Sequence, residues 1–169
     1  MSHPREHLED WLRDAYAMER QAQTLLESQL NRLENYPLLQ DRIRLHLDQT
    51  LNQLALVESC LRRLGTAPST IKDLAARVAA YGQVAGSVLA SDEAVKSAMA
   101  GYVFEHVEIA AYTTLISAAD ALGEYEIREC CERILGEEEA MASWLLRHIP
   151  ELTAAFLERS AVQRDDAKR

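Results

Sequence analysis

Apolar residues recur every three or four positions along most of this chain, which is the spacing of one face of an α-helix. Glycine and proline are sparse, at six and four of 169 residues, and most of them fall where the periodicity breaks. Alternation of apolar and polar residues never extends beyond a few positions, which argues against strands. The pattern therefore predicts an all-α protein.

The breaks in the periodicity predict four long helices. Their expected ranges are residues 4–33, 37–64, 91–123 and 124–148. The turns within the first pair and within the second pair are short, so each pair is expected to form an antiparallel hairpin.

The remaining segments connect or extend these hairpins. Residues 66–92 are expected to form a crossover with a shorter helix from about Ile71, and a short docked helix is expected over 150–161, after a break at Pro150. Two helical hairpins joined by one long connection describe a ferritin-like four-helix bundle. We expect a single domain over residues 1–161 and a frayed tail over 162–169.

Three of the long helices carry a glutamate inside the apolar seam. These residues are Glu19, Glu105 and Glu138. Burying a lone carboxylate costs several kcal/mol on a rough scale, and three together cost more unless they are neutralised or share a cation. The pattern therefore predicts a metal site inside the bundle.

Helix geometry places these carboxylates at similar heights. Glu108 and Glu138 each lie fifteen positions from Gly123, and at about 1.5 Å per residue they should be level. Glu105 precedes Glu108 by one turn, so both could lean toward one site. Tyr112 shares this seam, where it either hydrogen-bonds a ligand carboxylate or fills the core.

The second helix has no carboxylate in its seam. Gln53 lies at the height expected opposite Glu19, and Asp48 and Gln49 are the other weak candidates for a ligand from this helix. His46 and His106 are expected to be surface or boundary residues, because no Glu-x-x-His motif is present.

Carboxylate ligands suit iron or manganese, with zinc as a substitute. If the site is enzymatic, the activity is expected to be of the di-metal oxidase or peroxidase kind, although the sequence identifies no catalytic residue. The alternative is a set of boundary glutamates that form salt bridges at the bundle edge and hold no cofactor.

Composition narrows the range of partners. A hydrophobic content of 48% can fill a core without disulfides, and a net charge of −9 with scattered basic residues argues against nucleic acid. No apolar run is long enough to cross a membrane, and three cysteines without metal-type spacing fit a reducing compartment. We expect a cytoplasmic protein that binds no membrane.

Three blocks of sequence carry a resemblance to a known family. They are HLEDWLRDAYAME at 7–19, GYVFEHVEIAAY at 101–112 and EEEAMASWL at 137–145. In these blocks the chain resembles the YciE/YciF-type ferritin-like proteins, YciE most closely. The resemblance covers essentially the whole chain and implies a bacterial stress-associated homodimer. It also implies that Glu19, Glu105, Glu108 and Glu138 match carboxylates of a di-metal centre.

The chain departs from the family pattern in the second helix. The family motif there reads His-Leu-x-Glu-Thr, whereas this chain has Gln49 in place of the glutamate. A neutral amide is a poorer ligand for a hard cation. Two hypotheses follow: a metal-binding stress protein with weak or no turnover, or a metal-free dimeric module that binds a YciF-like or other helical partner.

Overall fold

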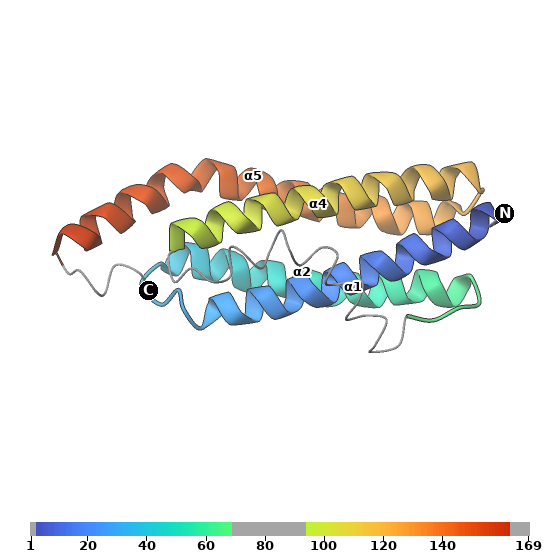
Figure 1. Ribbon diagram of the computed structural model, residues 1–169, viewed down its shortest axis with the longest axis horizontal. Coiled ribbons are helices and arrows are strands. Elements are labelled where there is room, and N and C mark those ends of the chain that lie inside the picture. Colours follow the sequence, from blue (N-terminus) through green and yellow to red (C-terminus); the bar gives the residue numbers. More distant parts are fainter. Residues whose placement is uncertain (1–2, 69–93, 163–169) are drawn as a thin grey trace.

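The structure is a computed structural model that describes residues 3–68 and 94–162. Four helices account for nearly all of these residues, and no strand occurs among them (Figure 1). The all-α prediction is thereby confirmed. The expected crossover helix lies outside the described residues, as does most of the expected tail. The helices are α1 (Pro4–Leu30), α2 (Pro37–Arg63), α4 (Ala94–Ala121) and α5 (Tyr125–Val162).

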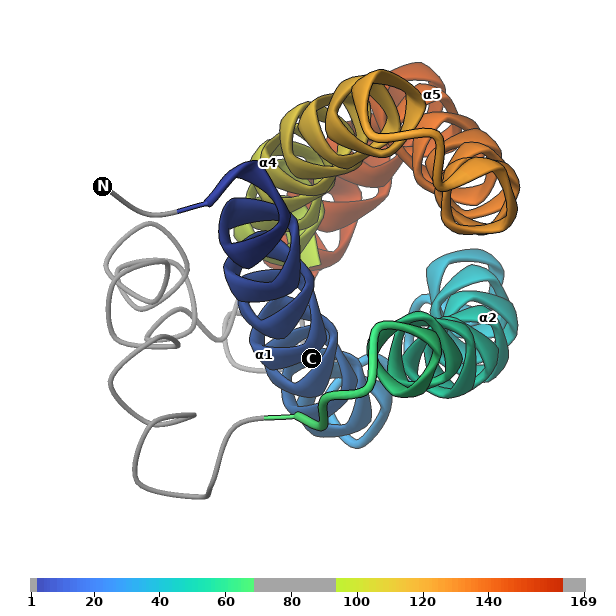
Figure 2. The same ribbon diagram turned by 90° about the vertical axis from the view of Figure 1, so that its right-hand side faces the viewer.

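The four helices surround one long core. In the end-on view, α1 lies between α2 and α4, and α5 lies between α4 and α2 (Figure 2). Helices α1 and α2 form one hairpin and α4 and α5 form the other, so both predicted hairpins are present. Within the described residues, no helix has the length and hydropathy needed to cross a membrane.

A glycine in the left-handed region follows the C-terminal end of both α2 and α4. Gly65 has φ 79° and Gly123 has φ 70°, a conformation that costs glycine no steric strain. After each glycine, the next amide reaches back to the last helical turn, as in the bonds from Thr66 to Leu61 and from Glu124 to Ala119. These caps end α2 and α4 where the sequence predicted.

Two apolar clusters fill the two ends of the bundle. One includes Leu12, Leu61 and Ile127, and the other includes Ile43 and Leu145. The buried polar residues lie in the interior of the helices, away from the helix ends. They are Glu19, Gln21, His46, Thr50, Gln53, Glu105, Glu108 and Glu138.

The seam of α4 differs from the predicted one by a small rotation. Ile109 and Ile116 are only partly buried, whereas Glu108 and Leu115 are almost fully buried. Spacings of three and four leave such a choice open, because the buried face of a helix is broader than one line of residues. The rotation turns Glu105 and Glu108 inward together.

The predicted helix break at Pro150 is wrong. Helix α5 continues through this residue to Val162 as one bent ribbon (Figure 1). Beyond the proline, Leu152 is buried and Phe156 packs in the same apolar cluster as Tyr36. A proline inside a helix costs about 3 kcal/mol. We attribute the continuity of α5 to this packing, whose energy is not considered when a helix end is predicted from a proline alone. Helix α1 stops at Leu30, three residues before the expected end.

Candidate metal centre

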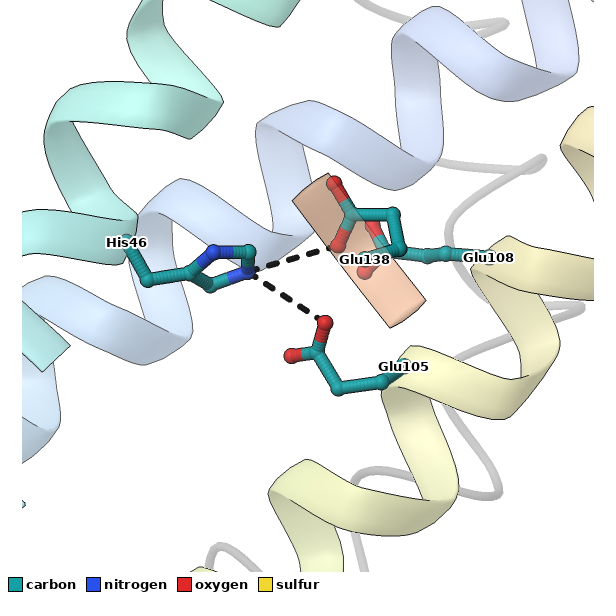
Figure 3. Close-up of side chains that lie close together, drawn as sticks. All are labelled: His46, Glu105, Glu108 and Glu138. Carbon is teal, nitrogen blue, oxygen red and sulfur yellow. Dashed lines mark ion pairs between the residues drawn. The ribbon is translucent and has the colours of Figure 1, made fainter. Parts of the chain in front are cut away.

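Four buried side chains from three helices meet at the middle of the bundle. Their candidate ligand atoms all lie within 4.8 Å of one another. Figure 3 shows the imidazole from α2 pointing at two carboxylates, with the third carboxylate behind them. The four residues are His46, Glu105, Glu108 and Glu138.

The imidazole of His46 is held from both sides. Its Nε2 atom lies 3.3 Å from Oε2 of Glu105 and 3.4 Å from Oε2 of Glu138. Its Nδ1 atom lies 3.2 Å from Oε1 of Gln49, one turn further along α2. An amide oxygen can only accept a hydrogen bond, so Nδ1 carries the proton in this contact. Gln49 therefore orients the ring so that Nε2 faces the carboxylates.

The expectation that His46 lies at the surface or boundary is wrong. The residue is 1% exposed. The sequence does indicate a buried position for His46, which lies three residues after Ile43 and four before Thr50. The neighbouring Leu47 fits the same apolar seam equally well, so the spacing does not choose between them. His106 is exposed, as expected.

Burial leaves several oxygen atoms of this cluster without a hydrogen-bond partner among the described residues. Both carboxylate oxygens of Glu108 are in this position, as is one oxygen of the adjacent Glu19. An unsatisfied buried polar atom costs about 1 to 3 kcal/mol. So many together indicate a site built for a ligand.

The electrostatics of the cluster follow from burial and crowding. Burial raises the pKa of Glu105 to about 8, against the attraction of His46. Burial and the neighbouring Glu138 carboxylate also raise the pKa of Glu19 and Glu108 well above the ordinary value. Without a cation, burial therefore favours the protonated form of these three carboxyl groups.

Glu138 and His46 form the charged pair of the metal-free cluster. Burial alone would raise the pKa of Glu138, but the hydrogen bonds and charge of His46 lower it. Burial alone would lower the pKa of His46, but Glu105 and Glu138 raise it well above its usual value. A half-buried cation, Arg42, lies within electrostatic reach of the same two carboxylates.

Glu19 stands beside the four clustered residues. Tyr112, which is fully buried, donates a hydrogen bond from its hydroxyl to Oε1 of Glu19. Of the two roles considered for Tyr112 from the sequence, the hydrogen bond to a candidate ligand is therefore present. The other oxygen of Glu19 has no hydrogen-bond partner among the described residues. When it is ionised, the Glu19 carboxylate raises the pKa of Glu108.

The other candidate ligands from the second helix differ in how they contact the cluster. Gln53 is fully buried, and its amide donates hydrogen bonds to Glu138 and, at 2.9 Å, to Glu137. Asp48 is exposed on the outer face of α2. Thus Gln53 contacts the cluster directly, Gln49 contacts it through His46, and Asp48 lies outside it.

The donor set fits a transition metal. Imidazole nitrogen with several carboxylate oxygens suits iron, manganese or zinc, whereas an all-oxygen set suits magnesium or calcium. The unpartnered oxygens of Glu108 and the orientation of His46 by Gln49 agree with this chemistry. The residues present therefore fit the metal that the seam glutamates predicted.

Comparison with known sequences and structures finds one matching family and several similar structures. The profile of a family described as "Domain of unknown function (DUF892)" matches residues 3–158. A crystal structure from Xanthomonas campestris is 38% identical, with a TM-score of 0.80, covering 94% of this chain and 99% of that one.

Two further structures share the fold. YcfI from Rhodopseudomonas palustris is 26% identical with a TM-score of 0.69, covering 86% of this chain and 94% of that one. The Escherichia coli stress protein YciF is 22% identical with a TM-score of 0.78, covering 91% and 99%. These matches support the expected YciF-type resemblance, and the expected closeness to YciE stays a prediction.

Proposed function

The chain belongs to the DUF892 family, and from this premise we propose that it is a metal-binding protein whose site lies inside the helical bundle. The observation that carries the proposal is the buried cluster itself, in which four ligand-type side chains lie within 4.8 Å of one another. Buried carboxylates with raised pKa values and unpartnered oxygens destabilise the folded protein when no cation is bound. A bound cation removes this cost.

Glu105, Glu108, Glu138 and the Nε2 atom of His46 would hold the metal, and iron or manganese is the proposed identity, with zinc as a substitute. When bound, such a metal supplies Lewis acidity and, for iron, redox capacity. The chain's own contributions are to orient His46 through Gln49, to fix Glu19 through Tyr112 and to surround the site with apolar layers.

Elemental analysis tests the proposal. Protein loaded anaerobically with iron(II) and desalted should retain at least one iron per chain, and Glu138→Ala should retain far less. Glu139→Ala is the matched control, because Glu139 is the exposed neighbour on the same helix. No retention by the wild type, or equal retention by Glu138→Ala, would exclude the assigned ligands.

Unfolding measurements give a second readout. A metal that binds only the folded state stabilises it by about 2.7 kcal/mol at a free concentration one hundred times its Kd. We expect this increment in the wild type and in Glu139→Ala, and its loss in Glu138→Ala. If iron raised the stability of all three proteins equally, it would be binding elsewhere.

The second candidate function is the metal-free helical interaction module. It is supported by large apolar side chains on the outer surface of α2, where Leu38 and Leu45 are 46% and 51% exposed and lie two turns apart. Such a stripe suits a homodimer or a YciF-like helical partner. Light scattering would detect the homodimer, and Leu45→Lys should then shift it to a monomer.

The fold shared with a stress protein supports the proposal that this chain also acts under stress. Transcript or protein levels under oxidative and osmotic stress would test this part separately, and unchanged levels would contradict it.

A further inference from the structure

A surface pocket of about 430 Å³ lies between α2 and α5, at the end of the bundle where α5 begins. Cys60 from α2 and Cys130 from α5 line it, together with the charged side chains of Arg63 and Glu126. The candidate metal ligand Glu138 lies two helical turns further along α5. The pocket is therefore separate from the proposed metal centre.

The two thiols face the same pocket from different hairpins. Both residues line the pocket, and Cys130 packs against the apolar cluster that contains Cys60. Cys60 is buried, whereas Cys130 is partly exposed. Cys130 is thus the more exposed of the two thiols that line the pocket.

From this geometry we propose that Cys60 and Cys130 form a peroxide-sensitive dithiol, in which Cys130 is oxidised at the pocket and Cys60 then closes a disulfide between α2 and α5.

The chemistry balances with hydrogen peroxide as the oxidant. The Cys130 sulfur attacks one peroxide oxygen, so that an S–O bond forms, the O–O bond breaks, and the thiol proton leaves with the other oxygen as water. The Cys60 sulfur then attacks the Cys130 sulfenic acid. An S–S bond forms, the S–O bond breaks, and the Cys60 proton leaves with the hydroxyl group as a second water. The two thiols supply the two electrons that reduce the peroxide.

The order of attack follows from exposure. Burial raises the pKa of Cys60, and it raises the pKa of Cys131 to about 12, so both remain protonated thiols that react slowly with peroxide. Cys131 is also 1% exposed and packs in the apolar cluster. Because adjacent helical residues point about 100° apart, it does not share the orientation of Cys130 toward the pocket.

The test uses the full chain, freed of metal by chelation and treated with hydrogen peroxide. Mass spectrometry of the non-reduced protein should show the loss of two hydrogen atoms, and peptide mapping should find the Cys60–Cys130 link. A reductant should restore the original mass. Absence of the link, or a predominant link through Cys131, would overturn the proposal.

Three variants separate the roles. Cys130→Ser should abolish the link, whereas Cys131→Ala should keep it and serves as the matched control from the adjacent position. Cys60→Ser should leave Cys130 as a sulfenic acid that dimedone labels, with no disulfide. If dimedone failed to label Cys130 in this variant while the protein remained folded by circular dichroism, the assigned first step would be wrong.

Discussion

At the scale of single residues, His46 connects the local sequence to the site. Its ring bridges two carboxylates through Nε2 and contacts Gln49 through Nδ1. A metal-bound histidine usually donates its second N–H to an oxygen acceptor, which fixes the ring and its tautomer. Gln49 supplies such an acceptor. The departure from the family motif at this position thus leaves an acceptor for His46 in place.

The first prediction concerns Gln49. Replacing it with leucine removes the acceptor of His46, and we expect metal affinity to fall about 10- to 100-fold. Gln49→Glu should raise affinity, because a carboxylate makes the imidazole a stronger donor. Competition with a chromophoric chelator measures both effects. Asp48→Asn, at the exposed neighbour, is the control, and a Gln49→Leu affinity equal to that of the control would contradict the prediction.

The second prediction concerns Tyr112. Tyr112→Phe keeps the ring but leaves the buried Glu19 without its donor, which should cost about 1 to 3 kcal/mol of unfolding free energy. Urea denaturation measures the loss. Tyr125→Phe provides the comparison, since Tyr125 is 58% exposed and should change stability little. Equal effects in the two variants would show that the hydrogen bond to Glu19 contributes nothing.

At the scale of elements, α5 shows packing overriding a local signal. Pro150 lacks the amide that would continue the helical ladder, yet α5 runs on for twelve residues to Val162. Leu152 anchors this extension against the cluster that contains Tyr36 and Ile43. This extension of α5 therefore completes the apolar cluster at one end of the bundle.

A prediction follows for this extension. Leu152→Ala should lower the unfolding free energy by about 2 to 5 kcal/mol, because it removes a buried side chain and leaves a cavity. Leu157→Ala, on the same helix but 60% exposed, should have little effect. Equilibrium urea unfolding compares the two. A loss in Leu152→Ala no larger than in Leu157→Ala would mean that the extension does not dock.

At the scale of the whole molecule, the buried cluster couples stability to pH. In the metal-free protein, Glu19, Glu105 and Glu108 have raised pKa values, so the folded state holds more protons than the unfolded state above about pH 4.5. The raised pKa of His46 acts in the same direction, with stability present below about pH 6.5 and lost as pH rises through the folded pKa. The lowered pKa of Glu138 opposes them, because its contribution is present above about pH 4.5 and lost below.

The metal-free protein should therefore lose stability between about pH 5 and pH 8. The slope is about 1.4 kcal/mol per pH unit for each extra proton that the folded state holds. Urea unfolding at several pH values, in the presence of a chelator, measures the slope. Glu108→Gln removes one of the titrating groups and should flatten it, which separates the cluster from the effect of net charge. Identical slopes in the two proteins would contradict the assignment.

The sequence by itself determined the helices, the hairpins and the inward positions of Glu19, Glu105 and Glu138. These follow from local periodicity and from glycine caps, which act over a few residues. Spacing from Gly123 placed Glu108 level with Glu138, and the two hairpins with one long connection predicted a ferritin-like bundle. The resemblance to the family agreed with both predictions.

Only the tertiary structure decided which groups meet at the site. His46 and Leu47 fit the seam of α2 equally well, and the choice between them depends on how α2 turns against α5. The rotation of α4, the contact of Gln49 with His46 and the continuity of α5 through Pro150 likewise arise where helices distant in sequence pack together. The spacing of residues along one helix does not predict such contacts, because their energy depends on the partner helix.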